Sequence, residues 1–190
     1  MFNIFLRLIA VISLFVAIFI GIGYLIPRGY EISAETEIAA PPSQVFPMVN
    51  VISNWEHWST WNSDTIPDLK IGYEGNESGV GSIQRWTDSR GEGVLEITKS
   101  ETEKLVEYDI QFVGFPKMHS TMKFEPTEKG TRIHWSSNGE LPSGAFYGYS
   151  GLLFEGQMEY EYQRSLEKLK NSSRRNEYQA TFLRNSDSSA

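Results

Sequence analysis

Residues 104–138 read KLVEYDIQFVGFPKMHSTMKFEPTEKGTRIHWSSN, and apolar and polar side chains alternate in three parts of this stretch. The alternating segments are 104–112, 118–126 and 131–138. A period of two is typical of a strand that buries one face. The connections contain Gly-Phe-Pro and Glu-Lys-Gly, which favour tight turns. The stretch therefore predicts three consecutive antiparallel strands.

Four more segments outside this stretch show the same strand pattern. They are 30–38, 69–73, 81–87 and 93–100, and turn residues such as Asp-Ser-Arg-Gly at 88–91 separate neighbouring segments. The short connections between them again favour antiparallel pairing. The chain thus contains seven predicted strands.

Helical patterns lie between the first two strands and after the last one. Pro-Pro-Ser at 41–43 opens a short helix, because proline suits the first helical turn. A second short segment covers 52–58, and tryptophans recur there at every third residue as far as Trp61. The long final helix is predicted over 154–170. Its apolar stripe consists of Met158, Tyr162, Leu166 and Leu169.

Residues 4–26 are apolar except for Arg7, Ser13 and Tyr24. Roughly 20 such residues form a helix that crosses a ~30 Å hydrocarbon core. Arg7 can extend to the headgroups from one end, and Tyr24 lies where interfacial aromatic residues occur. The alternative is a cleaved signal peptide, whose apolar run would be shorter, about 7–15 residues, and would end at a small-residue cleavage site. The sequence therefore favours an uncleaved transmembrane helix.

The charges flanking this helix give only a slight orientation signal. Arg7 and the α-amine lie on one side, and Arg28 lies on the other, where Glu31 and Glu35 follow it. We expect a short N-terminal tail inside and the soluble domain on the non-cytoplasmic side. The absence of cysteine excludes disulfides and zinc–thiolate sites.

The soluble part of the chain is acidic. Residues 27–170 hold 13 Lys and Arg and 22 Asp and Glu, a net charge of −9, which makes a poor surface for nucleic acid. The last residues are rich in Ser, Asn and Arg, which is typical of a disordered tail. We predict a membrane anchor over 1–27, one domain over 28–171 and a disordered tail over 172–190.

The order of these elements predicts an α+β domain. One strand, two short helices, six strands and a long helix suit an antiparallel sheet that curls around the C-terminal helix. Such a sheet buries one face and leaves the other to water, which agrees with one apolar side on most strands.

Four motifs carry a resemblance to a known family. They are ETEIAAPPSQVF at 35–46, NWEHWSTW at 54–61, GVGS at 79–82 and GTRIHW at 130–135. In this order and spacing they resemble the polyketide cyclase/dehydrase-like branch of the START and Bet v 1 (SRPBCC) superfamily, from about residue 30 to 170. The resemblance implies a helix-grip fold, in which a seven-stranded antiparallel sheet surrounds a long C-terminal helix and leaves an apolar cavity. It implies no particular reaction, because the fold does not fix the function.

Aromatic and Met side chains supply the candidate ligand-binding residues. Small-molecule sites are mostly apolar with few polar groups, although the same residue types also build ordinary cores. The glycine-containing run 141–151 is the candidate lid over the opening. The predicted lining consists of Trp58, Trp61, Trp86, Tyr108, Phe112, Met122, Trp135, Phe146, Tyr149, Met158 and Tyr162, with Leu153 beside them.

We assign no catalytic residue, metal site or cofactor from the sequence. Strand alternation places His119, His134 and Asp109 on polar faces, and His57 lies in the tryptophan segment. Metal-binding, nucleophile-elbow and phosphate-loop motifs are absent from the sequence. The weaker candidates for acid–base or enolate-stabilising chemistry are Arg85, Tyr108, Glu140, Glu155, Glu159 and Tyr162.

The leading hypothesis is a membrane-tethered binding module that holds an apolar small molecule or lipid. Its partners would be that ligand and the bilayer, through residues 4–26, with no nucleic acid. One alternative is a cyclase- or dehydrase-type enzyme, which requires titratable groups directed into the cavity. The other is a protein-interaction module whose cavity is filled by its own side chains.

Overall fold

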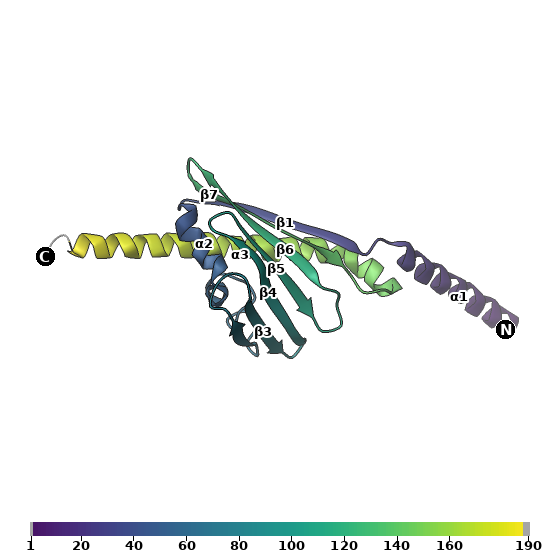
Figure 1. Ribbon diagram of the computed structural model, residues 1–190. Helices are drawn as coiled ribbons and strands as arrows, with labels where there is room; N and C mark the ends of the chain where they lie inside the picture. Colours follow the sequence, from purple (N-terminus) through teal and green to yellow (C-terminus); the bar gives the residue numbers. More distant parts are fainter. Residues whose placement is uncertain (1, 188–190) are drawn as a thin grey trace.

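A computed structural model describes residues 2–187, with side-chain positions as far as Arg174 (Figure 1). Its elements follow the predicted order. They are α1 (Phe2–Leu25), β1 (Gly29–Ile38), α2 (Pro42–Asn50), the 3₁₀ helix η1 (Ile52–His57), β2 (Lys70–Gly75), β3 (Ser82–Asp88), β4 (Gly91–Glu101), β5 (Leu105–Phe112), β6 (Met118–Thr127), β7 (Gly130–Glu140) and α3 (Ala145–Asp187).

All seven strands form one antiparallel sheet in the order β1-β7-β6-β5-β4-β3-β2. Strands β2 to β7 are therefore a meander, and the N-terminal β1 adds to its last strand. The register places Trp135 of β7 between Ala34 of β1 and Met122 of β6. These three side chains face the same side of the sheet, since directly opposed residues share a face. The predicted α+β class and seven-stranded sheet are confirmed.

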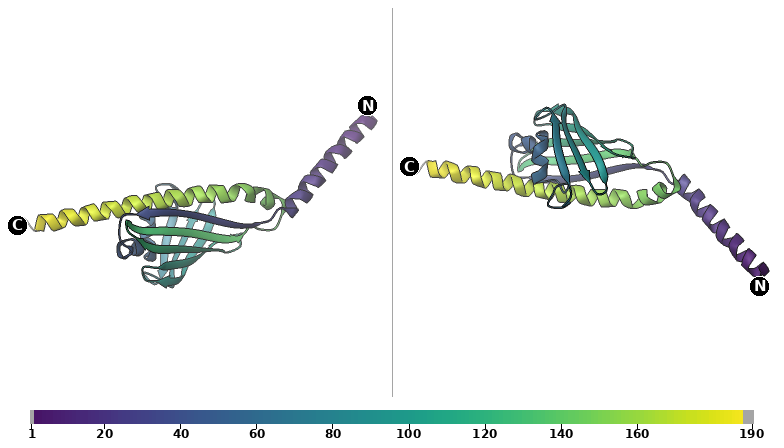
Figure 2. Two further views of the ribbon diagram at one scale, coloured as in Figure 1. Left: turned by 90° about the horizontal axis from the view of Figure 1, so that it is seen from above. Right: turned by 90° about the horizontal axis from the view of Figure 1, so that it is seen from below.

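Helix α3 lies along one side of the curled sheet, and β1 is the strand closest to it (Figure 2). The apolar stripe predicted for this helix is its buried face: Leu166 and Leu169 are fully buried, and Tyr162 is nearly so. The other helices, α2 and η1, also contact α3. The core is thus closed by a sheet on one side and by three helical segments on the other.

Helix α3 is longer than the sequence pattern predicted. It begins at Ala145, nine residues before the expected start, and continues to Asp187 through most of the predicted disordered tail. Residues 188–190 lie outside the described part of the chain. The early start also means that residues 145–151, predicted as part of a mobile lid, form the first two turns of this helix.

The N-terminal helix α1 contacts the first turns of α3. The rings of Phe19 and Tyr149 are stacked with their centroids 4.3 Å apart, and the Tyr149 hydroxyl donates a hydrogen bond to the Phe19 carbonyl at 2.7 Å. A methyl group added to Gly23 would lie 2.6 Å from the Ala145 carbonyl oxygen. Glycine at this position therefore permits the close approach of the two helices. By length and composition, α1 is the one helix of residues 2–187 able to cross a membrane.

Candidate functional site

Five side chains on the inner face of the sheet and on α3 form a buried hydrogen-bonded group, here called the hydroxyl cluster. Trp135 Nε1 donates to the Tyr108 hydroxyl at 2.7 Å. Ser120 Oγ and Ser137 Oγ are 2.5 Å apart, and Ser137 Oγ lies 2.7 Å from the Tyr162 hydroxyl. The register explains the meeting, because Tyr108, Ser120 and Ser137 are directly opposed on β5, β6 and β7.

Burial controls the ionisation of the two tyrosines in the hydroxyl cluster. It raises the pKa of Tyr108 well above the ordinary value for a phenol, with the neighbouring Tyr162 adding to the effect. Burial also raises the pKa of Tyr162, although hydrogen bonds from Ser137 and Ser120 oppose the rise. Both phenols are therefore neutral at physiological pH and act as donors and acceptors of hydrogen bonds rather than as bases.

Tryptophans from η1 and its C-terminal end cover the hydroxyl cluster. Trp55 Nε1 donates to the Val49 carbonyl at 2.7 Å, and Trp58 Nε1 donates to the Met48 carbonyl at 2.8 Å. These bonds satisfy both indoles with the backbone of α2 and orient their rings toward the sheet. The Trp58 ring centroid lies 5.9 Å from that of Trp135, which itself stacks on Tyr162 at 3.8 Å.

A second aromatic group, here called the aromatic triad, lies farther along the sheet. It consists of Trp61, Trp86 of β3 and Phe112 of β5, whose ring centroids are 5.4–5.9 Å apart in edge-to-face geometry. Edge-to-face contacts of this kind suit the quadrupoles of aromatic rings. Trp86 is buried, whereas Trp61 and Phe112 are half-buried. The triad therefore lies at the edge of the core, where the interior meets solvent.

Three buried polar atoms in this part of the interior have no hydrogen-bond partner among the described residues. They are Trp61 Nε1, Ser82 Oγ and Gln84 Oε1. Gln84 precedes Trp86 by two residues on β3, so both side chains lie on the inner face. A buried polar group without a partner costs about 1–3 kcal/mol. These atoms are suited to a molecule that offers both a hydrogen-bond acceptor and a donor.

The segment that carries Trp61 has no helix or strand between η1 and β2. Its start is held to α3, because Thr60 N donates to Ser165 Oγ at 3.0 Å. The Arg90 guanidinium of the β3–β4 turn lies over the Trp61 ring, 4.7 Å from its centroid. Trp61 is thus a half-buried ring at the border of the interior, and side-chain contacts rather than regular secondary structure hold it there.

The structure brings most of the predicted lining residues into the interior. Trp58, Tyr108, Met122, Trp135 and Tyr162 are buried around the hydroxyl cluster, where they pack against one another. The triad residues and Met158 pack against the same core. Phe146 and Tyr149 do not join them: Phe146 is exposed and Tyr149 contacts α1. The sequence reading missed Ser120, Ser137 and Gln84, although strand alternation places all three on inner faces.

The charged candidates lie outside this interior. His119 Nδ1 is 2.9 Å from Asp109 Oδ1 on the outer face, and Arg85 pairs with Glu74 at 3.0 Å at the surface. The buried polar side chains of residues 2–174 belong to Ser, Thr, Asn and Gln. Over the part of the chain that the structure describes, no group of three His, Cys, Asp or Glu side chains could hold a metal ion. The described interior therefore offers neutral hydrogen-bonding groups.

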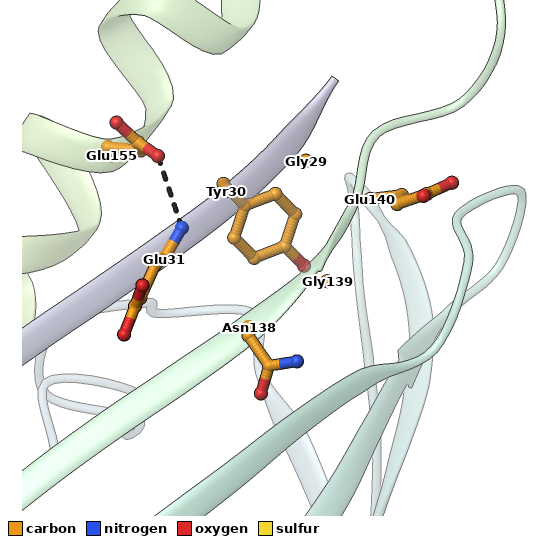
Figure 3. Close-up of a pocket in the computed structure, with 7 residues that line it drawn as sticks. All are labelled: Gly29, Tyr30, Glu31, Asn138, Gly139, Glu140 and Glu155. Atoms are coloured by element: carbon orange, nitrogen blue, oxygen red, sulfur yellow. Dashed lines mark hydrogen bonds between the residues drawn. The ribbon is translucent and has the colours of Figure 1, made fainter. Parts of the chain in front are cut away.

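A separate open pocket of about 500 Å³ lies on the surface where β1, β7 and α3 meet (Figure 3). Its lining includes Glu31, Glu140 and Glu155, and Glu155 Oε1 accepts a hydrogen bond from the Glu31 backbone N–H at 3.1 Å. The Tyr30 ring lies across it toward Gly139 (Figure 3). Its acidic, open character differs from that of the apolar interior.

Solved structures with this fold come from several organisms. A protein of unknown function from Staphylococcus aureus, SA2116, matches with a TM-score of 0.65 at 12% identity, covering 80% of this chain and 98% of that one. TTHA0849 from Thermus thermophilus matches with a TM-score of 0.58 at 18% identity, covering 76% and 97%. Ara h 8.0201 matches with a TM-score of 0.52 at 18% identity, also covering 76% and 97%. These similarities confirm the helix-grip fold.

Sequence comparisons give the family. A search of curated proteins finds no match. The family model described as polyketide cyclase / dehydrase and lipid transport matches residues 30–174. That range spans the sheet and the buried part of α3. The chain therefore belongs to the polyketide cyclase / dehydrase and lipid transport family.

Proposed function

We propose that this protein is a membrane-tethered binding module that takes up an apolar molecule carrying a polar group. The ligand would occupy the interior beside the aromatic triad, with α1 holding the domain at the bilayer. Family and fold support a ligand-binding module.

The observation that carries the proposal is the combination of an aromatic wall with unpaired polar atoms. The aromatic triad supplies flat apolar contact area, and two of its members are only half-buried. Trp61 Nε1 is a donor and Gln84 Oε1 an acceptor, and both lack partners in the described chain. Ligand sites generally combine an apolar lining with few polar groups that fix orientation.

Entry of the ligand would proceed by displacement of Trp61. Its segment has no helix or strand, so it can move at lower cost than the sheet or α3. Thr60 would remain attached to Ser165 of α3 as the fixed end of this movement. The Arg90 guanidinium over the Trp61 indole stabilises the observed position of Trp61 by about 0.5–1 kcal/mol, the usual value for a cation–π contact at an exposed site.

The proposed tether favours an apolar ligand, because apolar molecules concentrate in membranes. Helix α1 has 24 residues and no charged side chain except Arg7, which corresponds to a length of about 36 Å. We further propose that the domain lies on the non-cytoplasmic side. Labelling of an engineered cysteine in the domain by a membrane-impermeant reagent on intact cells tests this orientation.

The packed interior gives a second candidate, a protein-interaction module that binds no small molecule. Trp58, Tyr108, Trp135 and Tyr162 fill the space between the sheet and α3 and bury one another. An enzyme has less support, because the hydroxyl cluster presents phenols with raised pKa values and contains no carboxylate or imidazole. The Asp88 side chain is only 2% exposed, but it is paired with Arg90 at 2.6 Å. Retention of a ligand therefore distinguishes the binding module from the protein-interaction module.

Native mass spectrometry of the full chain, released from detergent micelles after incubation with a membrane lipid extract, tests ligand binding. We expect a discrete added mass. Gln84→Leu should weaken its retention about 5- to 150-fold, since one buried hydrogen bond to the ligand is lost, at about 1–3 kcal/mol. Fold stability should be kept, because Gln84 Oε1 has no partner in the free protein.

The matched control is Gln111→Leu, which makes the same replacement at an exposed position of β5. Retention should be unchanged in this variant. An unloaded mass in every condition would refute ligand binding and favour the interaction module. Equal retention by both variants would refute the role of Gln84.

A further inference from the structure

We infer that the first turns of α3 and the tip of the β5–β6 turn form a second membrane contact, which enters the headgroup and upper acyl region of the leaflet beside α1. This inference rests on the proposed membrane tether. It concerns a surface that ligand binding does not require. We call this surface the leaflet-facing patch and define it by Val113, Phe115, Phe146, Leu152 and Leu153.

The leaflet-facing patch collects most of the exposed apolar side chains of the soluble domain. Among residues 26–174, eight large apolar side chains are exposed, and these five are at the end next to α1. Their exposed fractions are 67% for Val113, 42% for Phe115, 74% for Phe146, 69% for Leu152 and 77% for Leu153. A gathered apolar surface of this kind marks a protein or membrane contact, whereas scattered apolar residues need no explanation.

Two parts of the chain come together in the patch. The Phe115 ring of the β5–β6 turn lies edge-to-face on Tyr147 of α3 with centroids 6.1 Å apart, and Tyr147 also contacts Phe146. Residues 141–154 contain no charged side chain, and neither do residues 110–116. The patch is therefore continuous and uncharged, as penetration into a leaflet requires.

Continuity with α1 identifies a lipid leaflet as the occupant. Tyr149 of α3 stacks on Phe19, which lies six residues before the end of α1. At about 1.5 Å per residue, Phe19 is about 9 Å below that end. Helices that lie in a membrane interface bury their apolar face by about 5–10 Å. The start of α3 is thus held at interfacial depth wherever α1 spans the bilayer.

Helix α3 presents apolar side chains on the face that would meet the leaflet. Phe146, Tyr149 and Leu153 are spaced i, i+3 and i+7, which places them on one face of the helix. Glu155, the first charged residue of α3, is two positions after Leu153 and therefore about 200° away around the helix. The acidic pocket that contains Glu155 is therefore on the other side of the helix from Phe146 and Leu153, and Leu152 lies at the border between the two sides.

Site-directed fluorescence tests this arrangement in the full chain, which has no native cysteine. The variant Leu153→Cys is labelled with an environment-sensitive nitrobenzoxadiazole probe and reconstituted into phosphatidylcholine vesicles. We expect blue-shifted emission and strong quenching by lipids that carry a nitroxide near the headgroup, with weaker quenching by a nitroxide at the chain end. The side chain is exposed, so the replacement should not affect folding.

Two further labelled positions separate the possible failures. Val80→Cys is also an exposed apolar position, but it lies in the β2–β3 turn. The neighbouring Gly79 N–H donates to the carbonyl of Asn50, the last residue of α2, and α2 lies at the far end of the domain from α1 (Figure 1). It should show neither the shift nor the quenching. Ile12→Cys, in the middle of α1, should be quenched most by the nitroxide at the chain end.

Quenching at Ile12 without quenching at Leu153 would overturn the leaflet contact and leave the tether intact. No quenching at Ile12 would overturn the tether and the leaflet contact together. Blue-shifted emission at Leu153 that no lipid nitroxide quenches would also overturn the inference, because the patch would then be covered by protein, such as a second copy of the chain.

Discussion

Replacing Tyr108 by Phe removes one oxygen from the hydroxyl cluster and leaves the ring in place. The Trp135 indole N–H then has no acceptor, because its single hydrogen bond is to the Tyr108 hydroxyl. Both side chains are buried. A buried donor without a partner costs about 1–3 kcal/mol, and no cavity term is added because the aromatic volume is kept. We expect Tyr108→Phe to lower the free energy of unfolding by about 2 kcal/mol.

Tyr162→Phe provides the matched comparison. It also removes one buried phenol oxygen, but Ser137 Oγ keeps Ser120 Oγ as its partner at 2.5 Å. No buried group loses its last hydrogen bond, so the cost should be that of an ordinary hydrogen bond, about 0.5–1.5 kcal/mol. The two variants therefore test whether the unpaired indole, and not the lost phenol, sets the cost.

Urea unfolding of the full chain in mild detergent micelles, followed by tryptophan fluorescence, measures both changes. The slope of free energy against urea should be the same for all three proteins, so the midpoints can be compared directly. A larger loss in Tyr162→Phe than in Tyr108→Phe would refute the reasoning. Equal losses would show that the Trp135 N–H finds another partner.

The remaining predictions concern pH and two glycines. Burial raises the pKa of Tyr30 to about 12, and the tyrosines of the hydroxyl cluster also have raised pKa values. Tyrosines of the unfolded chain ionise near pH 10. The free energy of unfolding should therefore be constant below pH 10 and fall above it by about 1.4 kcal/mol per pH unit for each such tyrosine. Urea midpoints between pH 8 and 11 measure this fall. Gly93→Ala should displace the Trp86 ring, which occupies the position of the new methyl group, and lower the free energy of unfolding by about 1–3 kcal/mol. The methyl group of Gly72→Ala meets nothing within 4 Å, so this variant should unfold in urea like the unchanged protein. Gly148→Ala should separate α3 from α1, because its methyl group would clash with the Gly23 carbonyl, whereas a methyl group at Gly156 meets open space. The distance between spin labels on α1 and α3 should therefore lengthen in Gly148→Ala and stay unchanged in Gly156→Ala.

Each of these predictions has a contradicting result. A urea midpoint that stays constant from pH 8 to 11 would mean that the buried phenols are not protected from ionisation. Equal stability of the Gly93 and Gly72 variants would contradict close packing of Trp86 on β4. An unchanged distance between α1 and α3 in the Gly148 variant would contradict the glycine-mediated contact.

The sheet was predictable from the sequence because local pattern and tertiary burial agree there. In β5, Val106 and Tyr108 alternate with Glu107 and Asp109, and the structure buries the first pair more deeply than the second. The turn sequences also set the strand order, since short connections leave antiparallel neighbours as the favoured pairing. Motif spacing then gave the family, which the match over residues 30–174 confirms.

The start of α3 was not predictable in the same way. Gly148 and Gly151 reduce intrinsic helix propensity, and the aromatic residues around Gly148, which are Phe146, Tyr147 and Tyr149, do not by themselves identify a buried face. Contact with α1 stabilises this segment as a helix, and sequence periodicity carries no information about such a contact. The hydroxyl cluster was missed for a related reason: an inward-facing Ser acquires a role only when the register places Ser120 opposite Ser137.

Only three residues, Ile26, Pro27 and Arg28, connect α1 to β1. Together with the glycine contact between α1 and α3, this connection removes the freedom that a flexible leash would give. With α1 in a bilayer, as proposed, the domain could not reach out to collect a molecule or carry it across a gap between membranes. Cargo would have to come to it, by diffusion within the same bilayer or on a mobile partner, so the protein would serve as a fixed station rather than a shuttle.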